Sequence, residues 1–187
     1  RKAVGTKLNV EMAVTAEMQG IAVAVRPDQV TLVPERPQEL TTEGGLDVLA
    51  HAAEIEPFIA RMHEAGIHVS IFLDPDIAQV KRAKAVGAAA IEINTGRYAE
   101  ATGAAIAPEL RRIEEAARAG AAEGLEVLAG HGLNYVNVVA IAAIPEIVEL
   151  NIGHSIVSRA SLVGLDSARR DNVALLPARY ASPPRRE

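Results

Sequence analysis

A parallel α/β fold is predicted for this 187-residue chain by three features of its sequence. Short apolar segments rich in β-branched residues alternate with helix-like segments, six times over. Hydrophobic residues make up 49% of the chain but aromatic residues only 3%, so the core must be aliphatic, as in a parallel sheet covered by helices. Polar residues stand at the ends of several apolar segments, where parallel α/β proteins carry their active sites.

The expected strands are short, and each is followed by a helix-like segment. Strict alternation of this kind implies parallel strands joined by right-handed crossovers. The strands are expected at residues 7–14, 29–34, 68–74, 89–95, 126–130 and 147–153.

The expected helices have recognisable ends. Thr15 and Asp76 suit N-cap positions, and Pro108 suits the first helical position. Gly66 and Gly87 stand where two helices should stop, because glycine readily adopts the left-handed conformation of a C-terminal cap. The helices are expected at residues 15–25, 46–65, 76–86, 108–123, 134–143 and 155–171.

The number of strand–helix units leaves two architectures open. A closed (β/α) barrel needs eight units and usually about 250 residues. The chain is therefore either an open, doubly wound sheet or a barrel whose first two units are absent. We expect one domain over residues 1–174, N-terminally incomplete, and a flexible tail over the proline-containing residues 175–187.

Composition excludes several classes of protein. The absence of cysteine excludes disulfides, thiolate metal sites and a cysteine nucleophile. A formal net charge of −5 argues against general nucleic-acid binding. No apolar run is long enough to span a membrane, and no apolar signal segment follows Arg1 and Lys2. We therefore expect a cytoplasmic protein without nucleic-acid or membrane partners.

Two glycine–histidine turns follow the last two expected strands, Gly-His-Gly at 130–132 and Gly-His-Ser at 153–155. An imidazole at a strand end exchanges protons near neutral pH, so His131 is a candidate for catalysis. The alternative is a histidine that only binds a loop carbonyl. His154 is better explained as part of a turn whose N–H groups hold phosphate at the start of the last helix.

Glu11 and Glu92 lie inside otherwise apolar strands. Burying an unpaired carboxylate is costly, so burial should raise the pKa and suit the group for acid–base catalysis. The alternative is a structural ion pair with a lysine or arginine. Two carboxylates facing inward would repel each other, so at least one should bind a cation or share a proton.

The longest connection, residues 35–45, has no apolar periodicity and resembles a functional loop. Thr41 and Thr42 could offer hydroxyl groups to a ligand there. Asp74 and Asp76 are explained more simply by a strand end and a helix N-cap than by a metal pair. No metal-ligand cluster, phosphate-binding P-loop or Ser-His-Asp pattern is present, so no metal is expected.

Five motifs together resemble the pyridoxine 5′-phosphate synthase family of the deoxyxylulose-phosphate-dependent route to vitamin B6. They occupy residues 8–13, 32–47, 69–74, 129–135 and 149–156, and the resemblance runs from about Lys7 to Asp171. It implies a TIM-type (β/α)₈ barrel that assembles into homo-octamers. It also implies condensation of 1-deoxy-D-xylulose 5-phosphate with 3-amino-2-oxopropyl phosphate to give pyridoxine 5′-phosphate, phosphate and water, without a cofactor.

The resemblance also implies roles for individual residues. Glu11 would be an acid–base carboxylate, His131 the proton donor and Glu92 a group that stabilises a transition state. Thr41 would bind the deoxyxylulose phosphate. The aminooxopropyl phosphate would be held by Gly132, Gly153 and His154.

The chain also departs from the family pattern. It has Asn94 and Val136 where the family usually has histidine. The two absent units would supply another basic histidine and phosphate-binding arginines. Two other functions therefore stay open: a truncated, inactive barrel that serves as a phosphate-binding or assembly module, and another phosphosugar barrel enzyme such as an epimerase or an indole-glycerol-phosphate-type synthase.

Overall fold

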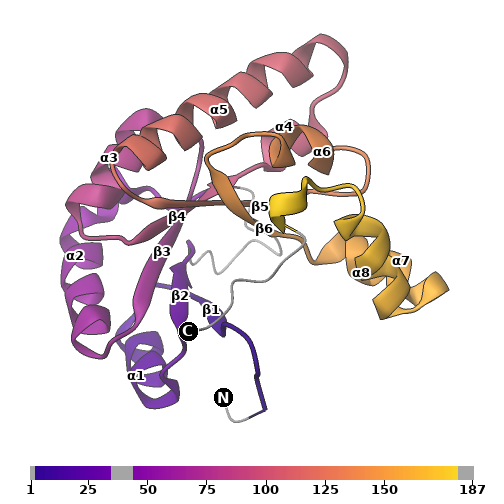
Figure 1. Ribbon diagram of the computed structural model, residues 1–187. Coiled ribbons are helices and arrows are strands. Elements are labelled where there is room, and N and C mark those ends of the chain that lie inside the picture. Colours follow the sequence, from indigo (N-terminus) through magenta and orange to yellow (C-terminus); the bar gives the residue numbers. More distant parts are fainter. Residues whose placement is uncertain (1–2, 35–43, 181–187) are drawn as a thin grey trace.

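The computed structural model describes residues 3–34 and 44–180, and within these ranges six parallel strands form one sheet. Neighbouring strands follow one another in sequence order, β1 to β6, without the reversal of order that defines a doubly wound sheet. The sheet curls into part of a barrel, with helices along its outer side (Figure 1). The strands are β1 (Asn9–Met12), β2 (Gln29–Leu32), β3 (His68–Leu73), β4 (Ala90–Asn94), β5 (Glu126–Gly130) and β6 (Ile147–Asn151).

The barrel architecture implied by the family resemblance is therefore confirmed for the part of the chain described, and the doubly wound alternative is wrong. Each strand lies inside or on a predicted segment. Helices α2, α3 and α5 run along the outer side of the sheet (Figure 1). The helices are α1 (Ala16–Val25), α2 (Val48–Glu64), α3 (Ile77–Ala85), α4 (Gly96–Glu100), α5 (Ile106–Ala122), α6 (Val138–Ala142), α7 (His154–Val163) and α8 (Leu165–Val173), with 3₁₀ turns at η1 (Gly103–Ala105) and η2 (Ala178–Tyr180).

Side-chain caps fix the starts of several helices. The side chain of Thr15 accepts a hydrogen bond from the Met18 N–H, and that of Asp76 accepts from Ala78 and Gln79, so both predicted N-caps are confirmed. The predicted start at Pro108 is wrong, because α5 begins two residues earlier and continues directly from the 3₁₀ turn η1.

The predicted last helix, 155–171, is in fact two helices. Gly164 separates α7 from α8 with φ 81° and ψ 151°, a conformation that residues with a Cβ rarely adopt. The short helix α4 was not predicted. Its five residues are too few to show a helical period in the sequence.

The main hydrophobic core lies between the convex face of the sheet and the helices. Alternate strand residues such as Ile71 and Ile91 are fully buried there with Ile59 and Ile113 from the helices. The intervening residues face the inside of the partial barrel, and many of them are polar. Buried residues of this concave face include Gln29, Thr31, Ser70, Phe72, Glu92 and Leu128.

The C-terminal segment is tied to β6 as far as Tyr180. The Arg179 guanidinium donates hydrogen bonds to the main-chain oxygens of Ala142 and Ile144, and the Tyr180 hydroxyl donates to Ile147 O at 2.6 Å. These bonds anchor the first part of the predicted flexible tail, and residues 181–187 lie outside the described ranges.

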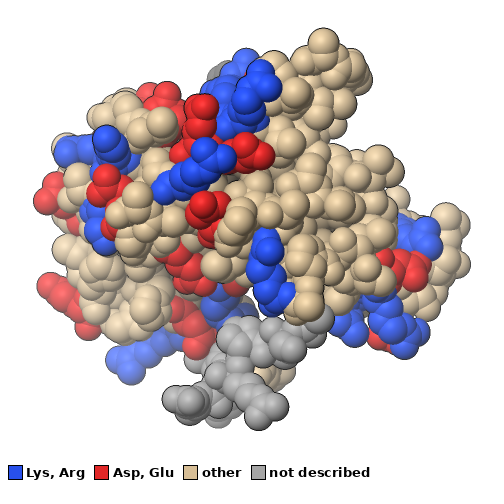
Figure 2. Space-filling model, turned by 45° about the horizontal axis from the view of Figure 1, so that its top comes forward, with Lys and Arg blue, Asp and Glu red and all other residues tan. Residues whose placement is uncertain are grey.

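Acidic and basic side chains are interspersed over the face shown in Figure 2 rather than gathered by sign. The ion pair of Arg159 with Asp171 joins α7 to α8, and Arg170 pairs with Asp166 within α8. Among the described residues, no helix combines the length and the apolar character needed to cross a membrane.

Candidate active site

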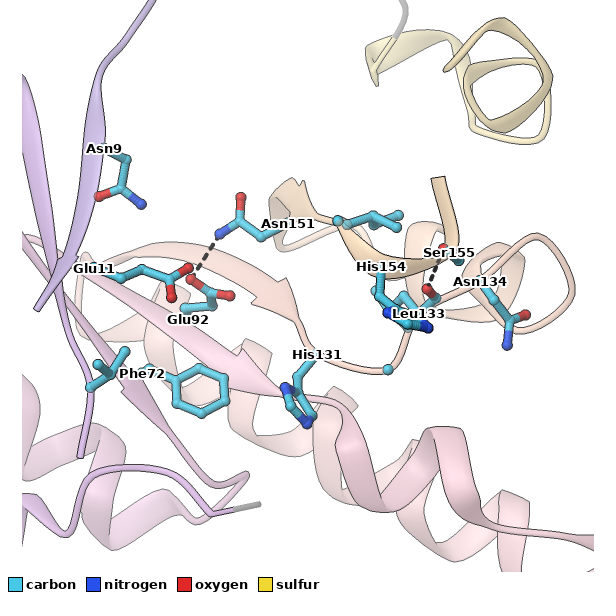
Figure 3. Close-up of a pocket in the computed structure, with 14 residues that line it drawn as sticks. Asn9, Glu11, Phe72, Glu92, His131, Leu133, Asn134, Asn151, His154 and Ser155 are labelled. Atoms are coloured by element: carbon cyan, nitrogen blue, oxygen red, sulfur yellow. Dashed lines mark hydrogen bonds between the residues drawn. The ribbon is translucent and has the colours of Figure 1, made fainter. Parts of the chain in front are cut away.

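A cavity of about 730 Å³ opens toward the carboxyl ends of the strands. It is lined by residues of β1, β3, β4 and β6 and by the segments that follow β2, β5 and β6, as the barrel fold requires of an active site. The predicted residues lie together around it (Figure 3), except Thr41, which lies outside the described residues. The lining includes Glu11, Glu92, His131, Gly132, Gly153 and His154.

Two carboxyl groups face each other inside the cavity (Figure 3). Glu92 is only 4% exposed, and this burial raises its pKa to about 7, helped by the nearby charges of Glu11 and Glu149. Asn151 donates a hydrogen bond to Glu92 Oε2 at 2.8 Å, which opposes the shift. The buried carboxyl group with a raised pKa that the sequence predicts is therefore found at Glu92. The predicted burial of Glu11 is wrong, because its side chain is exposed on the open side of β1.

A lysine stands nearby but pairs elsewhere. Lys7 forms an ion pair with Glu149, and its charge lowers the pKa of Glu92 less than burial raises it. Among the residues that the structure describes, the structural alternative, in which a basic partner neutralises Glu92, is therefore not the arrangement seen. At neutral pH Glu92 is present in both protonated and ionised forms.

A missing side chain makes room for Glu92. A Cβ built on Gly130 would lie 2.3 Å from Glu92 Oε1 and 3.1 Å from the Cβ of Asn151. Gly130 was interpreted only as a turn residue, but its lack of a side chain is what allows the carboxyl group to occupy this position.

His131 sits on a strained turn directly after β5. Its φ is 79° and that of Gly132 is 73°, so two successive residues are left-handed. For a residue with a Cβ, such a conformation costs about 1–3 kcal/mol and persists only where the surroundings enforce it. The imidazole packs 6.2 Å from the Phe72 ring, measured between centroids, at the edge of the cavity.

The second glycine–histidine turn starts a helix. Gly153 is the N-cap of α7 and His154 its first residue, so unpaired main-chain N–H groups end at the cavity. The Ser155 hydroxyl donates to Leu133 O at 2.8 Å and so ties this turn to the one after β5. A helix N-terminus of this kind suits a phosphate group.

Asn9, Phe72 and Asn151 are among the further lining residues for which the sequence predicts no role. Asn151 carried the same signal as Glu92, a polar side chain at the end of an apolar strand and in register with the inward face. Asn9 opens β1 two residues before Glu11 and shares its face. Among the described residues, no group of three or more His, Cys, Asp or Glu is placed to hold a metal ion.

This fold and this cavity define a class: a TIM-type barrel enzyme that carries acid–base groups and an anion-binding turn at the carboxyl ends of its strands. The chain belongs to the family described as pyridoxal phosphate biosynthesis protein PdxJ, whose model matches residues 1–177. The resemblance stated from the sequence motifs is thereby confirmed.

Relatives of known name agree with this assignment. The pyridoxine 5′-phosphate synthase of Trichlorobacter lovleyi is 56% identical over 177 residues, which cover 94% of this chain and 74% of the relative. That of Geobacter sulfurreducens is 55% identical over the same lengths.

Solved structures show the same fold at low identity. A crystal structure of a xylose isomerase domain protein from Planctomyces limnophilus matches with a TM-score of 0.56 and 15% identity, covering 92% of this chain and 72% of that one. An HpcH/HpaI aldolase from Desulfitobacterium hafniense matches with a TM-score of 0.53 and 12% identity, covering 91% and 74%.

Proposed function

We propose that this chain is a pyridoxine 5′-phosphate synthase, which condenses 1-deoxy-D-xylulose 5-phosphate with 3-amino-2-oxopropyl phosphate. The products are pyridoxine 5′-phosphate, inorganic phosphate and water. The observation that carries the proposal is the convergence of Glu11, Glu92 and His131 in one cavity beside the turn at 153–155. Relatives that carry this enzyme name share more than half of their aligned residues with the chain.

The chemistry needs groups that move protons. The amine of one substrate attacks the ketone of the other to form a Schiff base, and phosphate loss, ring closure and aromatisation follow. Each stage adds a proton to an oxygen or removes one from carbon or nitrogen. Because the pKa of Glu92 is about 7, both the protonated and the ionised form of this carboxyl group are present at neutral pH.

Glu11 and His131 complete the acid–base set. Glu11 lies on β1 and His131 after β5, so a substrate in the cavity has a carboxyl group on one side and an imidazole on the other (Figure 3). We assign proton abstraction and return to Glu11, and proton donation to a leaving oxygen to His131. We assign to Glu92, which lies beside Glu11 in the cavity (Figure 3), the stabilisation of charge that develops during the reaction.

Both substrates and the product carry phosphate groups, and we assign one of these groups to the turn at the start of α7. The N–H groups at the start of α7, with Gly153 and His154, are suited to the phosphate of the aminooxopropyl substrate. Gly132 also lines the cavity, and the family resemblance assigns it to the same phosphate. Thr41 is assigned to the deoxyxylulose phosphate by family resemblance alone.

The test is a two-substrate condensation assay on purified wild-type, Glu11→Gln and His131→Asn proteins. Loss of a proton-transferring group should lower kcat by about 10²–10⁴-fold. Near wild-type rates in both variants would contradict the residue assignment. Phosphate binding without any turnover by the wild-type protein would favour the inactive binding module.

We also propose that the enzyme works in the cytoplasm as a homo-oligomer, an octamer by family resemblance. Large apolar side chains on α7 and α8 are exposed, including Leu162 at 86% and Leu165 at 64%, and a subunit contact would cover them. Light scattering on the purified protein tests the assembly, and a monomer at assay concentrations would contradict it.

A further inference from the structure

Thr95 follows β4 directly, and it is fully buried. Its hydroxyl lies 2.7 Å from Gly130 O and 2.6 Å from His131 O, while its main-chain N–H donates to Gly130 O at 2.8 Å. A hydroxyl has one proton to donate, so the two carbonyl oxygens share it. All three contacts cross from the end of β4 to the turn that carries His131.

The carbonyl oxygens that Thr95 contacts belong to the strained part of that turn. His131 has φ 79°, and in the described ranges only Arg26 is another non-glycine residue with positive φ. The direction of the His131 carbonyl sets the peptide plane that joins it to Gly132. A hydrogen bond to this oxygen therefore fixes the orientation of that peptide plane and favours the left-handed conformation of His131.

One edge of the imidazole lies against Gly96 of α4, although His131 as a whole is exposed. A Cβ on Gly96 would lie 2.9 Å from His131 Cδ2, and a Cβ on Gly132 would lie 2.6 Å from the Cβ of Ala99, so α4 packs directly on the turn. Asn94 Oδ1 accepts a hydrogen bond from Gly96 N and fixes the start of α4. The place of the ring against Gly96 and Phe72 therefore depends on the backbone conformation of the turn.

We propose that Thr95 is a positioning residue for His131. Its hydroxyl group holds the left-handed turn after β5 and thereby keeps the imidazole aimed at the cavity. The inference rests on the proposed function, because it takes His131 as the proton donor of the condensation. Thr95 itself does not line the cavity and acts only through the turn.

The first experiment compares Thr95→Val, which keeps the shape of the side chain but removes the hydroxyl, with Thr95→Ser, which restores it. Thr95→Val should lower kcat by about ten- to a hundredfold with little change in KM, because a misplaced catalytic group slows chemistry more than binding. Thr95→Ser should stay within about twofold of wild type. A wild-type kcat in Thr95→Val would overturn the proposal.

Tyr98→Phe is the matched control. The Tyr98 hydroxyl donates to Asn137 O at 2.9 Å, at the far end of the same β5–α6 connection, so this variant also loses a hydroxyl-to-carbonyl bond. It leaves His131 untouched and should keep wild-type kcat. An equal loss in Tyr98→Phe and Thr95→Val would mean that general loosening of the loop, and not the turn at His131, is responsible.

A double-mutant cycle separates positioning from a merely structural role. In the His131→Asn background, Thr95→Val should cost no further kcat, because residues that act through one another are not additive. A full additional loss would overturn the proposal. If Thr95→Val does not fold, Thr95→Cys, which has a far weaker donor, replaces it in the same cycle.

A measurement without turnover keeps this inference distinct from the proposed function. Side-chain NMR of the His131 imidazole should show its resonances shifted and broadened in Thr95→Val and restored in Thr95→Ser. If the wild-type protein fails to form product, the proposed function fails, and the NMR comparison still decides whether Thr95 holds the ring. An unchanged imidazole spectrum in Thr95→Val would overturn the positioning role.

Discussion

On the convex face of the sheet, side chains such as Ile71 and Ile91 are fully buried against helices, whereas on the concave face Ser70 and Glu92 occupy the neighbouring positions of the same strands. Successive residues of one strand are therefore apolar on the convex face and polar on the concave face. The convex face stabilises the fold by burying apolar area. The concave face keeps polar groups at an energetic cost, because the cavity needs them.

Substitutions of Ile91 and Glu92 separate the contribution of the convex face to stability from that of the concave face to catalysis. Ile91→Ala removes a fully buried side chain that faces α5 and should lower the free energy of unfolding by about 2–5 kcal/mol. At a temperature where the variant stays folded, kcat should be close to wild type. Urea denaturation and the condensation assay check the two halves, and a large loss of kcat in the folded variant would break the comparison.

Glu92→Gln should have the opposite signature. The raised pKa means that the folded protein holds the proton more tightly than the unfolded chain, so the stability due to this proton is complete below pH 4.5 and is lost as pH rises through about 7. Glutamine cannot ionise, so the variant does not lose this stability as the pH rises. The variant should match wild type near pH 4 and exceed it at pH 8 by on the order of 3 kcal/mol, with reduced kcat. A constant stability difference across this range, measured by urea denaturation, would contradict the prediction.

A pair of glycines sharpens the comparison further. A Cβ on Gly120 in α5 would lie 2.8 Å from Ile91 Cδ1 on the convex side, whereas a Cβ on Gly130 would lie 2.3 Å from Glu92 Oε1 in the cavity. Gly120→Ala should cost about 1–3 kcal/mol of stability and leave kcat intact. Gly130→Ala should displace the Glu92 carboxyl group and lower kcat by about tenfold or more. Equal kinetic losses in the two variants would contradict this division.

Ser70 should give the smallest effect. Its hydroxyl is fully buried on the concave face and has no hydrogen-bond partner among the described residues. Removing an unpaired buried hydroxyl is neutral or favourable, so Ser70→Ala should leave the melting temperature unchanged or raise stability by about 1 kcal/mol. A clear loss of stability would show that the hydroxyl has a partner in solution, such as a bound water molecule.

The alternation of the two faces explains why the sequence was informative about strands and about the cavity. Glu11 and Glu92 stood out because an apolar strand has no other reason to contain a carboxylate, and both line the cavity. The same rule would have found Asn151. The starts of α1 and α3 could be predicted because Thr15 and Asp76 cap these helices with their own side chains.

Features that depend on contacts between distant segments were not predictable. The left-handed turn at His131 is contacted by Thr95 and by α4, which lie more than thirty residues away in sequence. The break between α7 and α8 at Gly164 was also missed. A single glycine does not change the helical periodicity of the sequence around it, and the reversal of the chain there depends on how the two helices pack. Thr41, which was assigned by resemblance alone, stays a prediction.

The α7 helix contributes no buried residue to the molecule, although its first turn reaches the cavity. A helix without buried side chains opens locally at little free-energy cost, so its amide hydrogens should exchange with deuterium faster than those of α2 or α5. A phosphate group bound at its N-terminus would oppose that opening. Binding of a phosphate compound in the cavity should therefore slow the exchange of amide hydrogens along α7. The low local stability of this helix makes it a sensitive probe of ligand binding.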